Sequence, residues 1–130
     1  MSADYTIVNF ETDVEDMAPH GGLAPNVEAR FAREPLGLKN SGVSRMRVKA
    51  SFRVPFGHTH AQQEEVYIVV KGSARLKLDD EVVELGPWDA VRIPPGVMRA
   101  VEGGPEGVEM VLVGAPAPRD TEMVPGWWSD

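Results

Sequence analysis

The sequence contains no cysteine and few basic residues, and both shortages exclude whole classes of function. Without cysteine there are no disulfides, thiolate nucleophiles or thiolate metal ligands, so any metal must be bound by nitrogen and oxygen. Thirteen lysines and arginines face 20 aspartates and glutamates, and the net charge of −7 argues against a nucleic-acid partner. No apolar run approaches the roughly 20 residues of a membrane span. The first ten residues also lack a basic region followed by an apolar one. We therefore expect a cytoplasmic protein with no membrane partner.

What the sequence does contain is a series of short apolar runs with period-two alternation, separated by single glycines and prolines. Many short strands with turn signals between them are typical of a β-sandwich or β-barrel. The length of 130 residues suits one domain with one core. We therefore expect a single all-β domain over residues 1–130. The expected strands lie within residues 5–9, 26–34, 44–52, 64–70, 73–80, 81–86, 89–96, 97–103 and 108–114.

Residues 57–72, with the sequence GHTHAQQEEVYIVVKG, hold a candidate metal site. His58 and His60 are two residues apart on an extended segment, so both rings project from the same face. A glutamate on the following strand would complete a set of three ligands with open positions opposite, an arrangement that suits Fe, Zn, Ni or Mn. Periodicity alone does not decide between Glu64 and Glu65. A solvent-exposed pair of histidines is the alternative interpretation.

This segment resembles the first motif of the cupin family, which is His-x-His, four residues, Glu, six residues, Gly. His58, His60, Glu65 and Gly72 occupy those places, so the resemblance selects Glu65 over Glu64. The second cupin motif is similar to residues 88–103, WDAVRIPPGVMRAVEG. The resemblance implies a double-stranded β-helix, or jelly-roll barrel, with a core at about residues 43–115. The terminal segments would then pack on this barrel or on a partner subunit.

Two positions depart from the family pattern. Trp88 stands where the second motif has glycine, so we expect the turn there to be made differently, at Gly86 and Pro87. Arg99 stands where cupins usually carry their last metal-binding histidine. Arginine stays protonated and offers only donors, so it cannot ligate a cation. The resemblance therefore implies three protein ligands instead of four.

The alternation of residues 97–101 directs Arg99 into the barrel, where its charge needs a partner. Three partners are open at this point. Glu65 could neutralise Arg99 and replace the metal site with a buried salt bridge. Another inward acid could hold Arg99 and leave His58, His60 and Glu65 for the ion. An anionic ligand could pair with the guanidinium, whose fork suits a carboxylate.

Other residues are weaker candidates. Tyr67 shares the face of Glu65 and, with Gln63, could contact a ligand in the cavity, although core packing and solvation are their alternatives. His20, in a glycine-rich loop, is a conceivable extra ligand. Trp127 and Trp128 would expose much apolar surface on a free tail, so we expect them to cover the barrel or a partner subunit.

Three functions remain open. In the first, His58, His60 and Glu65 bind a divalent metal, Arg99 lines the cavity for a small carboxylate, and the activity is dioxygenase-like or isomerase-like. In the second, a metal-free cavity with an Arg99–Glu65 salt bridge binds or epimerises a sugar-like small molecule, with a histidine as base. In the third, the protein is a sensor or storage module without turnover.

We expect a homodimer, because an N-terminal edge strand and the tryptophan tail would offer an unpaired edge and apolar surface. Light scattering at micromolar concentration checks this expectation, and a clean monomer mass would contradict it.

Overall fold

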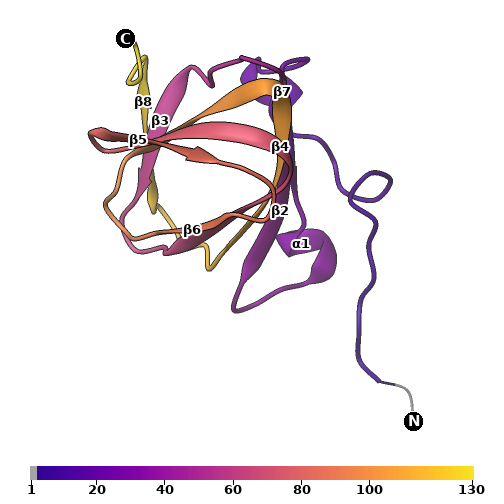
Figure 1. The fold of residues 1–130 in the computed structure, drawn as a ribbon. Coiled ribbons are helices and arrows are strands. Elements are labelled where there is room, and N and C mark those ends of the chain that lie inside the picture. Colours follow the sequence, from indigo (N-terminus) through magenta and orange to yellow (C-terminus); the bar gives the residue numbers. More distant parts are fainter. Residues whose placement is uncertain (1–2) are drawn as a thin grey trace.

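The computed structural model describes residues 3–130, which form eight strands, one short α-helix and one 3-10 turn (Figure 1). In chain order these elements are η1 (Ala18–Gly21), β1 (Val27–Phe31), α1 (Arg33–Leu36), β2 (Gly42–Val48), β3 (Phe56–His60), β4 (Glu65–Leu78), β5 (Glu81–Leu85), β6 (Ala90–Ile93), β7 (Arg99–Gly114) and β8 (Thr121–Pro125). The predicted all-β fold class is confirmed.

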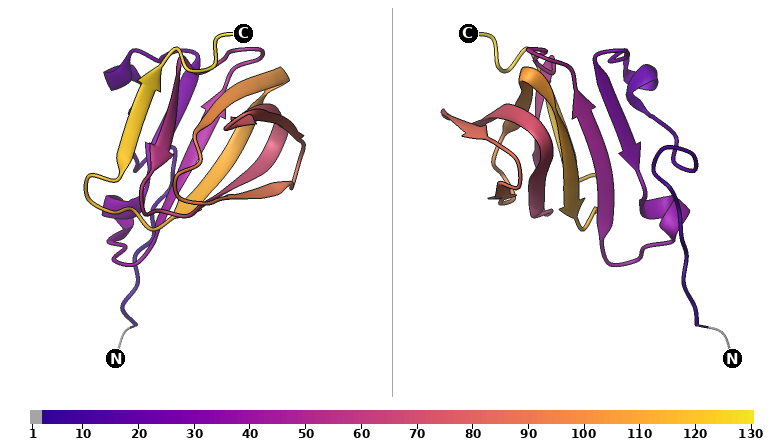
Figure 2. Two further views of the ribbon diagram at one scale, coloured as in Figure 1. Left: turned by 90° about the vertical axis from the view of Figure 1, so that its left-hand side faces the viewer. Right: turned by 45° about the vertical axis from the view of Figure 1, so that its right-hand side comes forward.

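The two longest strands, β4 and β7, form the centre of the curled antiparallel sheet. They pair from Glu65 opposite Gly114 to Leu78 opposite Arg99. β7 also pairs with β2 and β3, while β4 also pairs with β5 and β6, so the sheet folds back on itself (Figure 2). β1 and β8 are the ends of the strand path β1-β2-β7-β3-β8. The curvature brings the ends of β3, β4 and β7 together, and these ends carry the candidate site.

Alternate residues of the strands fill the interior, as their period-two pattern predicts. The largest fully buried side chains include one charged residue, Arg99, among apolar and aromatic neighbours. The buried apolar core is made of Ala18, Val27, Val48, Val54, Tyr67, Val69, Ala74, Leu76, Ile93, Val101, Val108, Met110 and Leu112. Within residues 3–130 no helix combines the length and apolar character needed to cross a membrane.

Glycines that suggested strand ends instead mark irregularities inside long strands. The sequence predicts separate strands on either side of Gly72, whereas β4 runs through it with register shifts next to it. Gly72 has a φ of 75°, and a β-carbon there would collide with the carbonyl oxygen of Gly107. β7 likewise continues past Gly103 and Gly104. A lone glycine in a strand pattern fits a bulge as well as a turn, so the sequence does not separate the two.

The predicted strand at residues 5–9 is wrong. This segment forms no strand and runs outside the barrel, with Tyr5 and Ile7 exposed at 72% and 81% (Figure 1). A strand needs a neighbour for its backbone hydrogen bonds, and the outer edge of β1 instead bridges Asp16 with Arg30. A short alternating apolar segment therefore does not form a strand when no neighbouring strand is available to pair with it.

The turn before β6 includes Gly86 and Pro87, as expected, but it also includes Trp88, which adopts the left-handed backbone conformation that favours glycine. Its φ is 69°, and the Gly86 N–H donates to the Asp89 carboxylate at 2.8 Å across the turn. The Trp88 side chain is 75% exposed, so the indole points away from the core.

The C-terminal tail packs on the barrel. β8 pairs with β3, and Trp128 is buried beneath the guanidinium of Arg53, 4.1 Å from the ring centroid. Trp127 lies against Gly57, where a β-carbon would meet its ring at 2.6 Å. The tail thus supports the strand that carries His58 and His60.

Candidate metal centre

Three strand ends place the predicted ligands beside one another. β3 ends with His58 and His60, β4 begins with Glu65, and β7 begins with Arg99. His58 and Arg99 are cross-strand partners, so their side chains leave the sheet as neighbours. Both histidines line the same cavity, as expected for two side chains on one face of a strand.

The structure brings His58, His60 and Glu65 into one cluster. One ligand atom from each lies within 4.8 Å of the others, and the two imidazole rings meet edge to face at 5.0 Å. Glu64 points outward, with 60% of its side chain exposed and Arg92 as its partner at 3.4 Å. The choice of Glu65 as the inward glutamate is confirmed.

Arg99 also points inward, as its alternation predicts, and its side chain has no exposed surface. Its Nη1 donates to Glu65 Oε1 at 2.5 Å, while Nη2 donates to the Val97 carbonyl at 3.1 Å. Of the three partners open from the sequence, the structure shows Glu65. One glutamate oxygen thus neutralises the arginine, and the second oxygen has no hydrogen-bond partner among the described residues.

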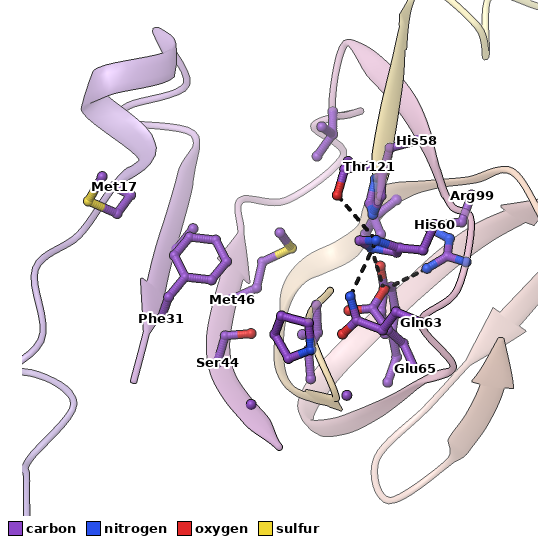
Figure 3. Close-up of a pocket in the computed structure, with 18 of the residues that line it drawn as sticks. Met17, Phe31, Ser44, Met46, His58, His60, Gln63, Glu65, Arg99 and Thr121 are labelled. Carbon is purple, nitrogen blue, oxygen red and sulfur yellow. Dashed lines mark hydrogen bonds and ion pairs between the residues drawn. The ribbon is translucent and has the colours of Figure 1, made fainter. Parts of the chain in front are cut away.

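Both ring nitrogens of His60 face carboxylates. Nδ1 lies 3.0 Å from Asp120 Oδ2. Nε2 lies 3.1 Å from Glu65 Oε1, and Figure 3 shows these two side chains beside each other. A neutral imidazole donates from one nitrogen only, so the other lone pair would face an anion. Either a second proton or a metal ion beside Nε2 removes this conflict.

Asp120 is the residue that the sequence reasoning missed. It lies in the loop between β7 and β8 and is 6% exposed. Its Oδ1 accepts the Gln62 N–H at 2.5 Å. Burial opposes its charged form, but the backbone N–H groups of Gln62 and Gln63 and the nearby His60 outweigh burial and lower the pKa of Asp120. Asp120 therefore stays charged and fixes the His60 ring.

The electrostatics of the cluster leave His58 neutral. Burial, then the charge of Arg99, then His60 lower the pKa of His58 to about 4. Its imidazole is unprotonated at neutral pH, so a lone pair is available to a cation. Burial and the Glu65 carboxylate raise the pKa of Tyr67 well above its ordinary value, so its hydroxyl keeps its proton.

The other predicted residues fall in different places. Gln63 and Tyr67 line the same cavity as the cluster, and Gln63 Nε2 lies 3.3 Å from His60 Nδ1. Thr121, at the start of β8, places its hydroxyl 3.2 Å from the same nitrogen. His20 is not a member of the cluster. It is exposed and pairs with Glu15 at 3.1 Å.

The cluster forms one end of a cavity of about 540 Å³. This volume is within the range of pockets that bind small organic molecules. The cavity extends from the histidines to the inner face of β1 and β2 (Figure 3). The cavity therefore gives a small ligand access to the cluster.

The donor set fits a divalent metal. Two imidazoles and one carboxylate suit Fe(II), Zn, Ni or Mn, and a carboxylate behind His60 is the usual partner of a metal-binding histidine. Ligand atoms around one zinc ion lie about 3–3.5 Å apart. His60 Nε2 and Glu65 Oε1 already have this spacing, and all three ligand atoms lie within 4.8 Å of one another, so the set would close only slightly on an ion.

Comparison with known proteins gives the family. The cupin domain family matches residues 44–114, which is more than half of the chain. No curated protein matches the sequence.

Solved structures agree on the fold. A cupin protein from Bacteroides fragilis has a TM-score of 0.71 at 23% identity, over 91% of this chain and 89% of that one. Oxalate decarboxylase from Bacillus subtilis has a TM-score of 0.77 at 22% identity over 95% of this chain, which spans 33% of the decarboxylase. A variant of Streptomyces PAC13 with uridine has a TM-score of 0.69 at 22% identity, over 95% and 92% of the two chains. Identities this low establish the fold alone. The family match and these structures together show that the chain belongs to the cupin family.

Proposed function

We propose that this cupin binds a divalent metal ion through His58, His60 and Glu65 and presents it to a small anionic ligand in the cavity. The observation that carries the proposal is the pair of carboxylates on His60, Asp120 at 3.0 Å and Glu65 at 3.1 Å. A cation at Nε2 converts the conflict with Glu65 into two favourable contacts.

The charges of the site support the same proposal. Histidines that bind a metal are neutral, so the protein charges of the loaded site are the carboxylates of Glu65 and Asp120 and the guanidinium of Arg99, which sum to −1. An uncompensated buried charge is costly, so this negative charge favours a cation beside it. A divalent ion would leave one positive charge, which a monoanionic ligand such as a carboxylate neutralises. Arg99 has no exposed surface, so it would attract this ligand through its charge.

The residues have distinct roles in this proposal. His58 and His60 supply lone pairs, Glu65 supplies an oxygen, and Asp120 holds the Nδ1 proton of His60. Gln63 and Tyr67 line the cavity where the ligand would lie. The bound ion would supply Lewis-acid chemistry or a site for O₂, which is the basis for a dioxygenase-like or isomerase-like activity.

A second candidate is a metal-free binding module. The direct Arg99–Glu65 ion pair at 2.5 Å favours it, because it neutralises the glutamate without an ion. In this case the cavity binds a small molecule through hydrogen bonds. The low pKa of His58, about 4, makes that residue a weak base for epimerisation.

Metal titration separates the two candidates. We expect the chelator-treated protein to bind Zn²⁺ or Ni²⁺ in calorimetry, and His58→Ala or His60→Ala to abolish this binding while the circular dichroism spectrum stays unchanged. His20→Ala is the matched control, since His20 is exposed and outside the cluster. A wild-type protein that binds neither ion would favour the metal-free module. Metal binding that survives both cluster substitutions would place the site elsewhere.

Asp120→Asn is expected to lower metal affinity by about 10–100-fold. One carboxylate oxygen of Asp120 accepts the Gln62 N–H and the other faces His60 Nδ1, whereas asparagine has only one oxygen. If that oxygen keeps the Gln62 N–H, the amide group faces His60 and moves the ring proton to Nε2, which can then no longer ligate. Calorimetry with Zn²⁺ measures the loss. Glu122→Gln, on the exposed side of β8, is the control. Equal affinities for the two variants would contradict the role of Asp120.

A further inference from the structure

The cavity is chemically divided between two ends. Its polar groups gather at the end that holds His58, His60, Glu65 and Arg99, while β1 and β2 form the opposite wall. Figure 3 shows Phe31 and Met46 across the cavity from this cluster. Along these two strands the lining side chains are apolar except for the hydroxyl of Ser44. The apolar ones are Val27, Ala29, Phe31, Val43 and Met46.

The size and polarity of the cavity argue against two ligand classes. A sugar or nucleoside carries hydroxyl groups over most of its length, and the β1–β2 wall offers almost no hydrogen-bond partners for them. Buried hydroxyls without partners weaken binding. A two-carbon dicarboxylate would meet the polar end but leave most of the cavity of about 540 Å³ empty. Neither class matches both ends.

We infer that the ligand is a monocarboxylate with an apolar body, either an acyl chain or an aryl group. This inference rests on the proposed function, because the carboxylate is directed to the metal at the polar end. The apolar body then lies along Met46 and Leu112 toward the exposed side of the cavity at Met17 and Phe31. The charge left by a divalent ion at the cluster complements one carboxylate.

The mouth of the cavity fits the same ligand class. Met17, Phe31 and Met123 line it and are exposed at 41%, 55% and 54%. Methionine side chains are flexible and polarisable, so they adapt to apolar groups of different shape. Arg33, at the start of α1, also lines the cavity, and its guanidinium donates to the carbonyls of Lys39 and Pro116 at 3.2 and 3.4 Å. An apolar chain can therefore extend to solvent past adaptable apolar groups.

A chain-length series tests the inference. The zinc-loaded protein is titrated by calorimetry with acetate, butyrate, hexanoate and octanoate, and with glucuronate and 1-octanol as controls. Each fully buried methylene raises affinity about four-fold. Allowing for partial burial, we expect octanoate to bind at least about 100-fold more tightly than acetate. Glucuronate should bind no more tightly than acetate, and octanol more weakly than octanoate.

Met46→Gln changes the wall without changing the cluster. The two side chains have similar volumes, so we expect octanoate affinity to fall about ten-fold while acetate and zinc affinities stay unchanged. Phe31→Ser, at the exposed rim, is a second variant with little risk to folding, and it should weaken octanoate in the same direction.

The failure of this inference differs from the failure of the proposed function. If zinc binds but acetate and octanoate bind equally, or glucuronate binds best, the ligand class is wrong and the metal site stands. If zinc does not bind, the proposed function fails. The same series is then measured on the zinc-free protein: affinity that rises with chain length supports binding to the β1–β2 wall, and affinity that does not change with chain length contradicts it. A dimer in light scattering whose cavity accepts none of the probes would mean that a second copy covers the wall, which also overturns the inference.

Discussion

Arg99→Met is expected to lower the free energy of unfolding by about 3–5 kcal/mol, because it leaves the Glu65 carboxylate without its partner. The Arg99 side chain has no exposed surface, Glu65 is 12% exposed, and their closest atoms are 2.5 Å apart. Removing one member of a buried pair leaves a charge that water reaches poorly. Urea unfolding of the chelator-treated protein measures the change.

Two controls show whether burial is the cause. Arg92→Met makes the same substitution at an exposed pair, where Arg92 and Glu64 are 63% and 60% exposed, and it should cost roughly 0–1 kcal/mol. Glu65→Gln removes the charge that Arg99 balances, so Arg99→Met should cost less in that background. If Arg99→Met costs no more than Arg92→Met, Glu65 is neutralised in some other way and the buried ion pair is not a structural requirement.

The sequence predicted those parts of the site in which the alternation of a strand sets the direction of the side chains. His58 and His60 share a face because they are two residues apart, and alternation also directed Arg99 inward. Glu65 needed the family motif, because Glu64 fits the same local pattern. Each of these residues belongs to a strand, so its direction follows from the pleat.

Asp120 was not predictable in the same way. It lies in a loop, about 60 residues from the histidine it contacts, and a loop has no period that fixes the direction of a side chain. The contact depends on β8 pairing with β3, which brings Asp120 to His60. Only the tertiary arrangement of the tail reveals that His60 has two carboxylates. The contact with Asp120 supports a cation at the site, because it places carboxylates beside both ring nitrogens of His60.

In the fold, too, some features follow from local alternation and others from contacts between distant parts of the chain. Alternation located most strands, but it predicted a strand at residues 5–9 that has no partner, and it divided β4 and β7 at their glycines. Trp88 keeps a φ of 69° because the surrounding turn fixes the backbone there. Strand pairing, which involves residues far apart in the chain, decided the first two cases, and the turn between Gly86 and Asp89 decided the third.

Arg99→His is expected to raise the affinity for a divalent metal by about 100-fold or more. The substitution removes a positive charge near the ion, and losing one unit-charge repulsion at ~5 Å is worth roughly 3 kcal/mol at an effective dielectric constant of 20. It also supplies an imidazole at the position paired with His58 across β3 and β7, so the new ring would lie beside the cluster. Glu65, released from Arg99, would then be free to bind the ion with either oxygen.

Arg99→Gln separates the two causes, since glutamine removes the charge without adding an imidazole. Calorimetric titration of the wild type and both variants with Zn²⁺ or Ni²⁺ should give affinities that rise from wild type to Arg99→Gln to Arg99→His. If the wild type is the metal-free module, it binds neither ion while Arg99→His begins to bind, so the unmodified protein distinguishes the two candidate functions. Unchanged or weaker binding by Arg99→His would mean that position 99 does not reach the ion. The cluster would then have to complete its coordination from the cavity side alone.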